Sequence, residues 1–123
     1  MWRPLAIFGV LLGVTAGPNQ ILKNVMREKL VHAQKILEAV VTSDWAGLET
    51  HTRELEQLTK DPRWTVLKYP EYARHSVAFV QTVQALRTAA GHRDLDLTPR
   101  AYTDVTLQCV ACHRYVARMR MAR

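Results

Sequence analysis

The chain has 123 residues, of which 48% are hydrophobic, and this length and composition are typical of one globular domain with one core. Its 17 Lys and Arg residues outnumber its 11 Asp and Glu residues and give a formal net charge of +6. A basic charge by itself suggests nucleic acid or an anionic membrane as a partner. We exclude nucleic acid, because no binding motif is recognisable and the charge is spread along the chain.

The first 16 residues are typical of an export signal. One positive side chain, Arg3, precedes a short apolar run from Leu5 to Val14, and small residues follow up to Ala16. Such a run is too short to span a bilayer, which takes about 20 residues. We expect cleavage after Ala16, so that residues 17–123 form the mature, exported domain. An uncleaved anchor is the alternative.

The mature sequence contains helical segments and no convincing strand. In the first segment, from about Pro18 to Val41, apolar residues recur at steps of three and four, the period of an amphipathic helix. These residues are Leu22, Met26, Leu30, Ala33, Leu37 and Val40, and Val25 and Ile36 widen the stripe. Ser43 is a favourable N-cap for a second helix, which ends by Lys60 because Asp61-Pro62 breaks it.

The second half of the chain contains two more helices. We expect the connection from Asp61 to Tyr69 to pack over them, because it contains apolar side chains. A third helix begins at Pro70 and stops at Gly91, and Thr98 caps a fourth helix. The apolar stripe of the fourth helix is Tyr102, Val105, Cys109, Cys112 and Val116. Four amphipathic helices with short links predict an all-α fold, an antiparallel four-helix bundle.

The only two cysteines lie three residues apart and are followed at once by a histidine, in the run Cys109-Val110-Ala111-Cys112-His113. This C-x-x-C-H pattern is typical of covalent c-type haem attachment. Each thiol adds across one vinyl group of the porphyrin, and the histidine binds the iron as proximal ligand. Positions i, i+3 and i+4 share one face of a helix. The pattern therefore predicts one covalent haem c, with its iron, on the core-facing side of the last helix.

Other interpretations of the cysteine pair are weaker. A structural zinc site takes four ligands, usually two such pairs. A disulfide between residues three apart gains little from closing so small a loop. A redox dithiol is the next alternative after haem attachment, but it calls for a βαβ context that the flanking sequence does not offer.

A C-x-x-C-H motif near the C-terminus of a four-helix chain resembles the class II cytochromes c, the cytochrome c prime group. The resemblance covers nearly all of the mature chain, with MREKLVHAQKILEAV in the first helix and AYTDVTLQCVACHRYV in the last. It implies one covalent haem bound through Cys109 and Cys112, with His113 as proximal ligand, and either electron transfer or binding of small gases. It also implies a periplasmic location, which agrees with the export signal. Many members have a basic residue where this chain has Ala117.

The resemblance further implies that the first helix supplies the residue on the distal side of the iron. Met26 lies early in that helix on its apolar stripe, and we expect it to be the distal iron ligand. The alternatives are a core-filling Met26 beside an open or water-bound iron, or ligation by another histidine. The remaining histidines are His32, His51, His75 and His92.

These features predict a periplasmic electron carrier and not an enzyme. The alternatives are a five-coordinate haem protein that binds NO or CO, and an accessory haem subunit of a larger redox complex. The expected partners are redox proteins, which would dock on a basic patch at the C-terminal end. That patch consists of Arg114, Arg118, Arg120 and Arg123. The favoured interpretation of these charges is that they complement the negative end of the helix dipole, and docking of a partner or pairing with the haem propionates is the alternative. A homodimer is an alternative to the monomer.

Overall fold

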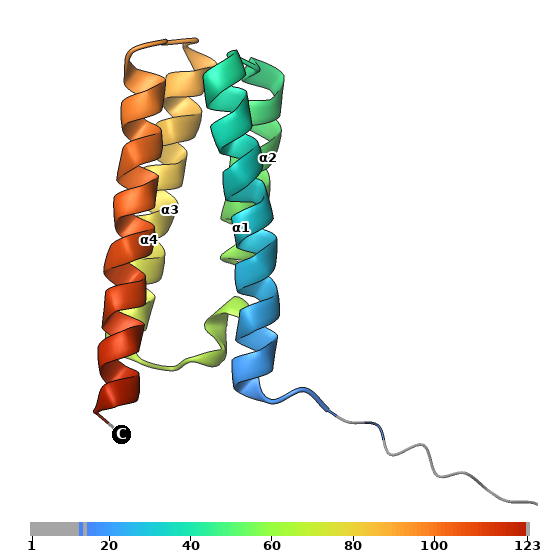
Figure 1. Cartoon of the computed structure of the whole chain (residues 1–123), viewed down its shortest axis with the longest axis vertical. Coiled ribbons are helices and arrows are strands. Elements are labelled where there is room, and N and C mark those ends of the chain that lie inside the picture. The colour runs from blue at the N-terminus through green and yellow to red at the C-terminus, as the bar shows by residue number, and fades with distance from the viewer. Residues whose placement is uncertain (1–12, 14, 123) are drawn as a thin grey trace, which may run out of the picture.

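The structure is a computed structural model that describes residue 13 and residues 15–122. In this part of the chain it consists of helices and loops, without a strand. The elements are α1 (Pro18–Thr42), α2 (Trp45–Leu58), the short 3₁₀ helix η1 (Trp64–Val66), α3 (Pro70–Gly91) and α4 (Leu97–Met121). The four α-helices run alternately up and down (Figure 1). The predicted all-α class is confirmed, and the arrangement is consistent with the predicted helical bundle.

Most of the predicted signal segment, residues 1–16, lies outside the described residues. Within the described part of the chain, no helix has the length and apolar character needed to cross a membrane.

The helices pack in chain order. α1 packs on α2, α2 on α3, and α3 on α4, whereas α1 and α4 contact each other far less. The largest side chains in the core come from the first three helices and include Ile36, Leu55 and Phe79. Since burial of such side chains supplies most of the driving force for folding, these three interfaces hold the fold together. The face between the first and last helices is the least packed.

The buried face of α1 differs from the predicted stripe. Leu30 and Leu37 are 57% and 47% exposed, so their predicted place in the core was wrong. Val25 and Ile36, which widen the predicted stripe, are buried as expected, and Lys29 is buried as well. The sequence pattern was misleading because α1 is apolar on two faces, and because the true inner face is interrupted by a lysine.

Two predicted helix caps were also wrong. Ser43 ends α1 in the left-handed conformation, with φ of 54°. The side chain of Asp44 caps α2, because its Oδ1 accepts a hydrogen bond from the amide of Gly47 at 2.9 Å. At the start of α4, the Asp94 carboxylate accepts from the amide of Leu97 at 2.8 Å. Thr98, which the sequence predicted to be the cap, is buried, and its hydroxyl has no hydrogen-bond partner among the described residues.

The connection between α2 and α3 packs on the helices, as predicted. Trp64 in η1 is buried, and its indole nitrogen donates a hydrogen bond to Ser76 at 2.9 Å. The Tyr72 hydroxyl donates to the Trp64 carbonyl at 2.7 Å. Arg63 forms ion pairs with Glu28 of α1, which fixes the connection to the first helix. The indole of Trp64 is thereby placed against the core.

Candidate haem site

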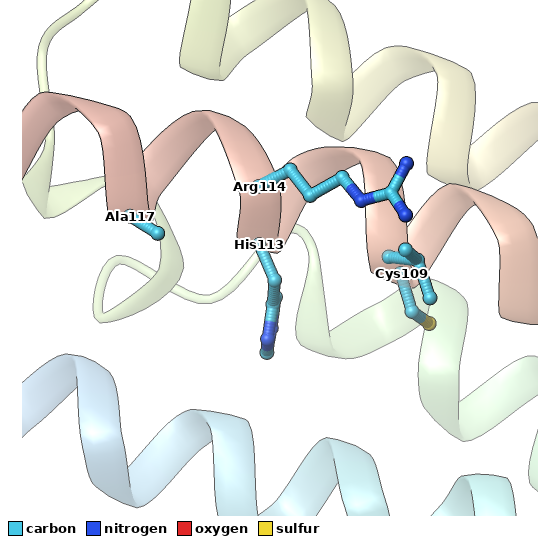
Figure 2. A pocket seen from close by; sticks show the side chains of 5 residues that line it. Cys109, His113, Arg114 and Ala117 are labelled. Atoms are coloured by element: carbon cyan, nitrogen blue, oxygen red, sulfur yellow. The ribbon is translucent and has the colours of Figure 1, made fainter.

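The residues of the C-x-x-C-H motif lie in the C-terminal half of α4. Figure 2 shows that the side chains of Cys109 and His113 leave the helix on one side, which faces α1. Cys109 and Cys112 are half-buried free thiols. A shallow, open cavity of about 350 Å³ lies on the surface of α4 beside Cys109 and His113. Its lining residues are Cys109, Val110, His113, Arg114 and Ala117, all of which belong to α4.

The surroundings of the motif favour the uncharged forms of its side chains. Burial raises the pKa of the Cys112 thiol, and the charge of Lys29 only partly opposes this effect. Partial burial lowers the pKa of His113, and the positive charges of Lys29 and Arg120 lower it further. A neutral imidazole has a free nitrogen lone pair, which is the form that binds a metal ion. The surroundings thus favour the neutral form of His113.

Two side chains of α1, Met26 and Lys29, lie against the core. Met26 is half-buried and packs against the core. Lys29, one turn further along, is only 7% exposed. Its Nζ lies 3.7 Å from the ring centre of Phe79 and 4.8 Å from that of Trp64. Sequence analysis identified Met26 and missed Lys29, although the spacing of three residues between them predicts a shared helix face.

Two tyrosines near the motif, the buried Tyr72 and the half-buried Tyr102, form hydrogen bonds between elements. The Tyr102 hydroxyl donates to the Ala33 carbonyl at 3.1 Å, and this bond joins α4 to α1 two turns before Cys109. Burial raises the pKa of Tyr102, and burial with the charge of Cys112 raises that of Tyr72 to about 12. Both phenols are therefore protonated at neutral pH and act as hydrogen-bond donors.

The other histidines have contacts elsewhere. His32 of α1 meets His51 of α2, with 3.1 Å between their Nδ1 atoms. His75 of α3 lies within 3.2 Å of the Gln108 amide and stacks at a tilt on Tyr115. His92 is exposed at the end of α3. Among the described residues, no group of three or more His, Cys, Asp and Glu side chains could hold a metal ion.

The predicted basic patch lies on the last two turns of α4. Arg114, Arg118 and Arg120 are exposed, and Arg114 also lines the cavity beside the cysteines. Arg123 lies outside the described residues. The patch and the opening of the cavity therefore share one end of the molecule.

Comparisons of the chain with models of protein families, with curated proteins and with solved structures found no match. The chemistry of the site consequently rests on its own residues.

Proposed function

We propose that the protein is a monohaem c-type cytochrome of the class II kind that carries electrons in the bacterial periplasm. Haem c is bound through Cys109 and Cys112, and His113 is the proximal ligand. The observation that supports the proposal is that the free thiol of Cys109 and the imidazole of His113 leave α4 on the side that faces α1, with a second free cysteine, Cys112, next to His113 in the sequence. The sparse contact between α1 and α4 supports it.

The residues present fit this cofactor. The two thiols are spaced by one helical turn, and the surroundings of the imidazole next to them lower its pKa, which favours its neutral form. Val110 and Ala117 give the cavity beside them apolar walls. When bound, the haem supplies a one-electron couple between ferric and ferrous iron.

The chain contributes anchoring, orientation and exclusion of water. Cys109 and Cys112 fix the porphyrin to α4, and His113 holds the proximal side of the iron. Met26 of α1 is the proposed distal ligand, and its soft, neutral thioether favours the ferrous state. The hydrogen bond from Tyr102 to Ala33 keeps α1 and α4 at a fixed separation near the site. If His113 and Met26 both held the iron, the site would suit electron transfer with little rearrangement.

The exposed arginines give the carrier a surface for its partner. Arg114 lies at the cavity, and Arg118 and Arg120 continue the positive charge along α4. A positive patch beside a redox centre steers an acidic partner toward it and raises the rate of encounter. We therefore propose a redox protein with an acidic surface as the partner.

Haem retention after denaturation tests the attachment. In acid-acetone extraction, the wild-type protein should keep its haem, and the double variant Cys109→Ser with Cys112→Ser should release it. His113→Ala leaves both thiols in place, so it should keep the haem but perturb its absorption spectrum. His92→Ala, an exposed histidine on another element, is the matched control and should leave the spectrum unchanged. Free extraction of haem from the wild type contradicts the proposal.

A further inference from the structure

Two histidines, His32 of α1 and His51 of α2, meet across the interface between the first two helices. Their Nδ1 atoms are 3.1 Å apart. The ring centres are 5.4 Å apart and the ring planes are inclined at 44°. The rings therefore meet at the edges that carry Nδ1 and do not stack face to face. Neither histidine has a part in the proposed function.

The packing of α1 on α2 holds the two rings at this separation. One turn beyond each histidine lies a fully buried aliphatic side chain, Ile36 on α1 and Leu55 on α2. Thr52, the neighbour of His51, is fully buried as well. These side chains fix both helices in the core, whereas the two imidazoles are only half-buried. The pair therefore lies at the rim of a rigid interface, within reach of solvent.

Each imidazole has the other as its partner. In the described part of the chain, no further hydrogen bond or ion pair includes His32 or His51. A neutral imidazole carries its proton on either Nδ1 or Nε2. With one proton on Nδ1, the two rings share a hydrogen bond. With both protons on Nε2, two lone pairs face each other, and a cation bound between them satisfies both.

The distance between the two nitrogens matches the spacing of two ligands on one metal ion. Imidazole nitrogens bind Zn²⁺ at about 2.0–2.1 Å. For angles at the metal from square-planar to tetrahedral, two such nitrogens are about 2.8–3.4 Å apart. The observed 3.1 Å lies within this range. The same distance also fits an N–H···N hydrogen bond, so the test below is designed to separate the two.

We propose that His32 and His51 form a binding site for a divalent transition-metal ion of the class that prefers imidazole, with Zn²⁺ as its representative. Each histidine binds through Nδ1. Water completes the coordination, because the pair is partly exposed and the described residues bring no third His, Cys, Asp or Glu side chain to it. Glu28, one turn before His32, is already paired with Arg63. An open site of this kind holds an exchangeable ion, unlike a closed structural zinc site.

Titration calorimetry of the purified holoprotein with Zn²⁺ tests this site. In the holoprotein of the proposed function both cysteines are thioethers and do not compete as thiolates. A protein without haem would be titrated as the double variant Cys109→Ser with Cys112→Ser. His32→Gln and His51→Gln should each weaken Zn²⁺ binding at least about tenfold, because loss of even an outer-shell partner costs about 10–100-fold. His92→Gln is the matched control, since His92 is exposed at the end of α3, and it should bind Zn²⁺ like the wild type.

X-ray absorption at the zinc edge tests the same site without any substitution. The zinc-loaded wild type should show two imidazole ligands, with oxygen ligands completing the shell. Three results would overturn the inference: no Zn²⁺ binding by the wild type, equal affinity in the wild type and both glutamine variants, or fewer than two imidazoles on the zinc. Each would leave a hydrogen-bonded histidine pair. None bears on the haem, because covalent haem is measured separately, and a haem-free protein with histidine-dependent Zn²⁺ binding would contradict only the proposed function.

Discussion

As the proposed distal ligand, Met26 would decide what the iron can bind. We expect Met26→Leu to preserve the fold, since the two side chains are similar in volume and apolarity. In the oxidised wild type, the weak far-red absorption band of thioether-ligated iron should be visible. In the variant that band should disappear, the iron should become high-spin, and CO should bind to the reduced protein. Absorption spectra of both proteins, with and without CO, measure all three changes.

Another result would assign Met26 to the core. If the wild-type iron is already high-spin and Met26→Leu leaves the spectrum unchanged, the side chain only fills space against the core. The gas-binding function would then be favoured over electron transfer, because an open sixth position permits small ligands to reach the iron.

At the level of single residues, the sequence was informative where chemistry dictates the spacing. Cys109 and His113 could be identified because only a few functions require their pattern. Lys29 could not, because a lysine within an amphipathic pattern is normally assigned to the solvent face. Its burial depends on aromatic rings supplied by α3 and η1, which are distant in sequence. Tertiary contacts of this kind leave no signal in the sequence around the residue itself.

The turn between α1 and α2 offers a direct test of two helix caps. Ser43 occupies the left-handed region with φ of 54°, which a glycine adopts without strain. Ser43→Gly should therefore stabilise the protein by about 0.5–1 kcal/mol. Asp44→Ala should destabilise it by about 1 kcal/mol, because the amide of Gly47 loses its acceptor. Chemical denaturation of each variant measures both changes, and equal effects of the same sign would contradict this assignment of the caps.

Arg63 forms ion pairs with Glu28 and Asp61, and we call these three residues the Arg63 cluster. They make the stability of the connection between α2 and α3 depend on pH. Hydrogen bonds from Arg63 lower the pKa of both Glu28 and Asp61 below their ordinary values of 4.5 and 3.8. A depressed carboxyl pKa means that the unfolded chain binds protons more readily than the folded one. The stability that this cluster contributes is therefore fully present above about pH 5 and is lost as the pH falls through the folded pKa values.

Arg63→Gln tests this dependence. At neutral pH the variant should unfold at a lower urea concentration than the wild type. The difference between the two midpoints should shrink as the pH is lowered from 7 to 3, because protonation of Glu28 and Asp61 removes the same interaction. A difference that stays constant over this range would mean that the ion pairs seen between these side chains do not contribute through their charge.

At the level of elements, the sequence predicted the number and approximate limits of the α-helices, because each has a clear period and proline or glycine near its ends. The third helix begins at Pro70 and ends at Gly91, as predicted. The caps were harder to predict, because neighbouring side chains such as Ser43 and Asp44 are both favourable N-caps by type. Which one accepts the hydrogen bond depends on backbone angles that composition does not determine.

For the molecule as a whole, the sequence predicts a mature chain that starts near Gly17. In the structure, α1 begins at Pro18, so cleavage after Ala16 would leave the helix whole. Mass spectrometry of the exported protein should give the mass of residues 17–123 with one haem. A protein that begins at Met1 and stays in the membrane fraction would instead indicate an uncleaved anchor.

The most direct measurement of the central claim is the absorption spectrum of the purified, exported protein in its oxidised and reduced forms. An electron carrier with haem c bound at Cys109, Cys112 and His113 should show the sharp bands of low-spin haem upon reduction, and CO should leave them unchanged. The bands should persist after acid-acetone extraction. A protein purified from a cell that attaches haem to its other c-type cytochromes, but without haem absorption of its own, would contradict the account.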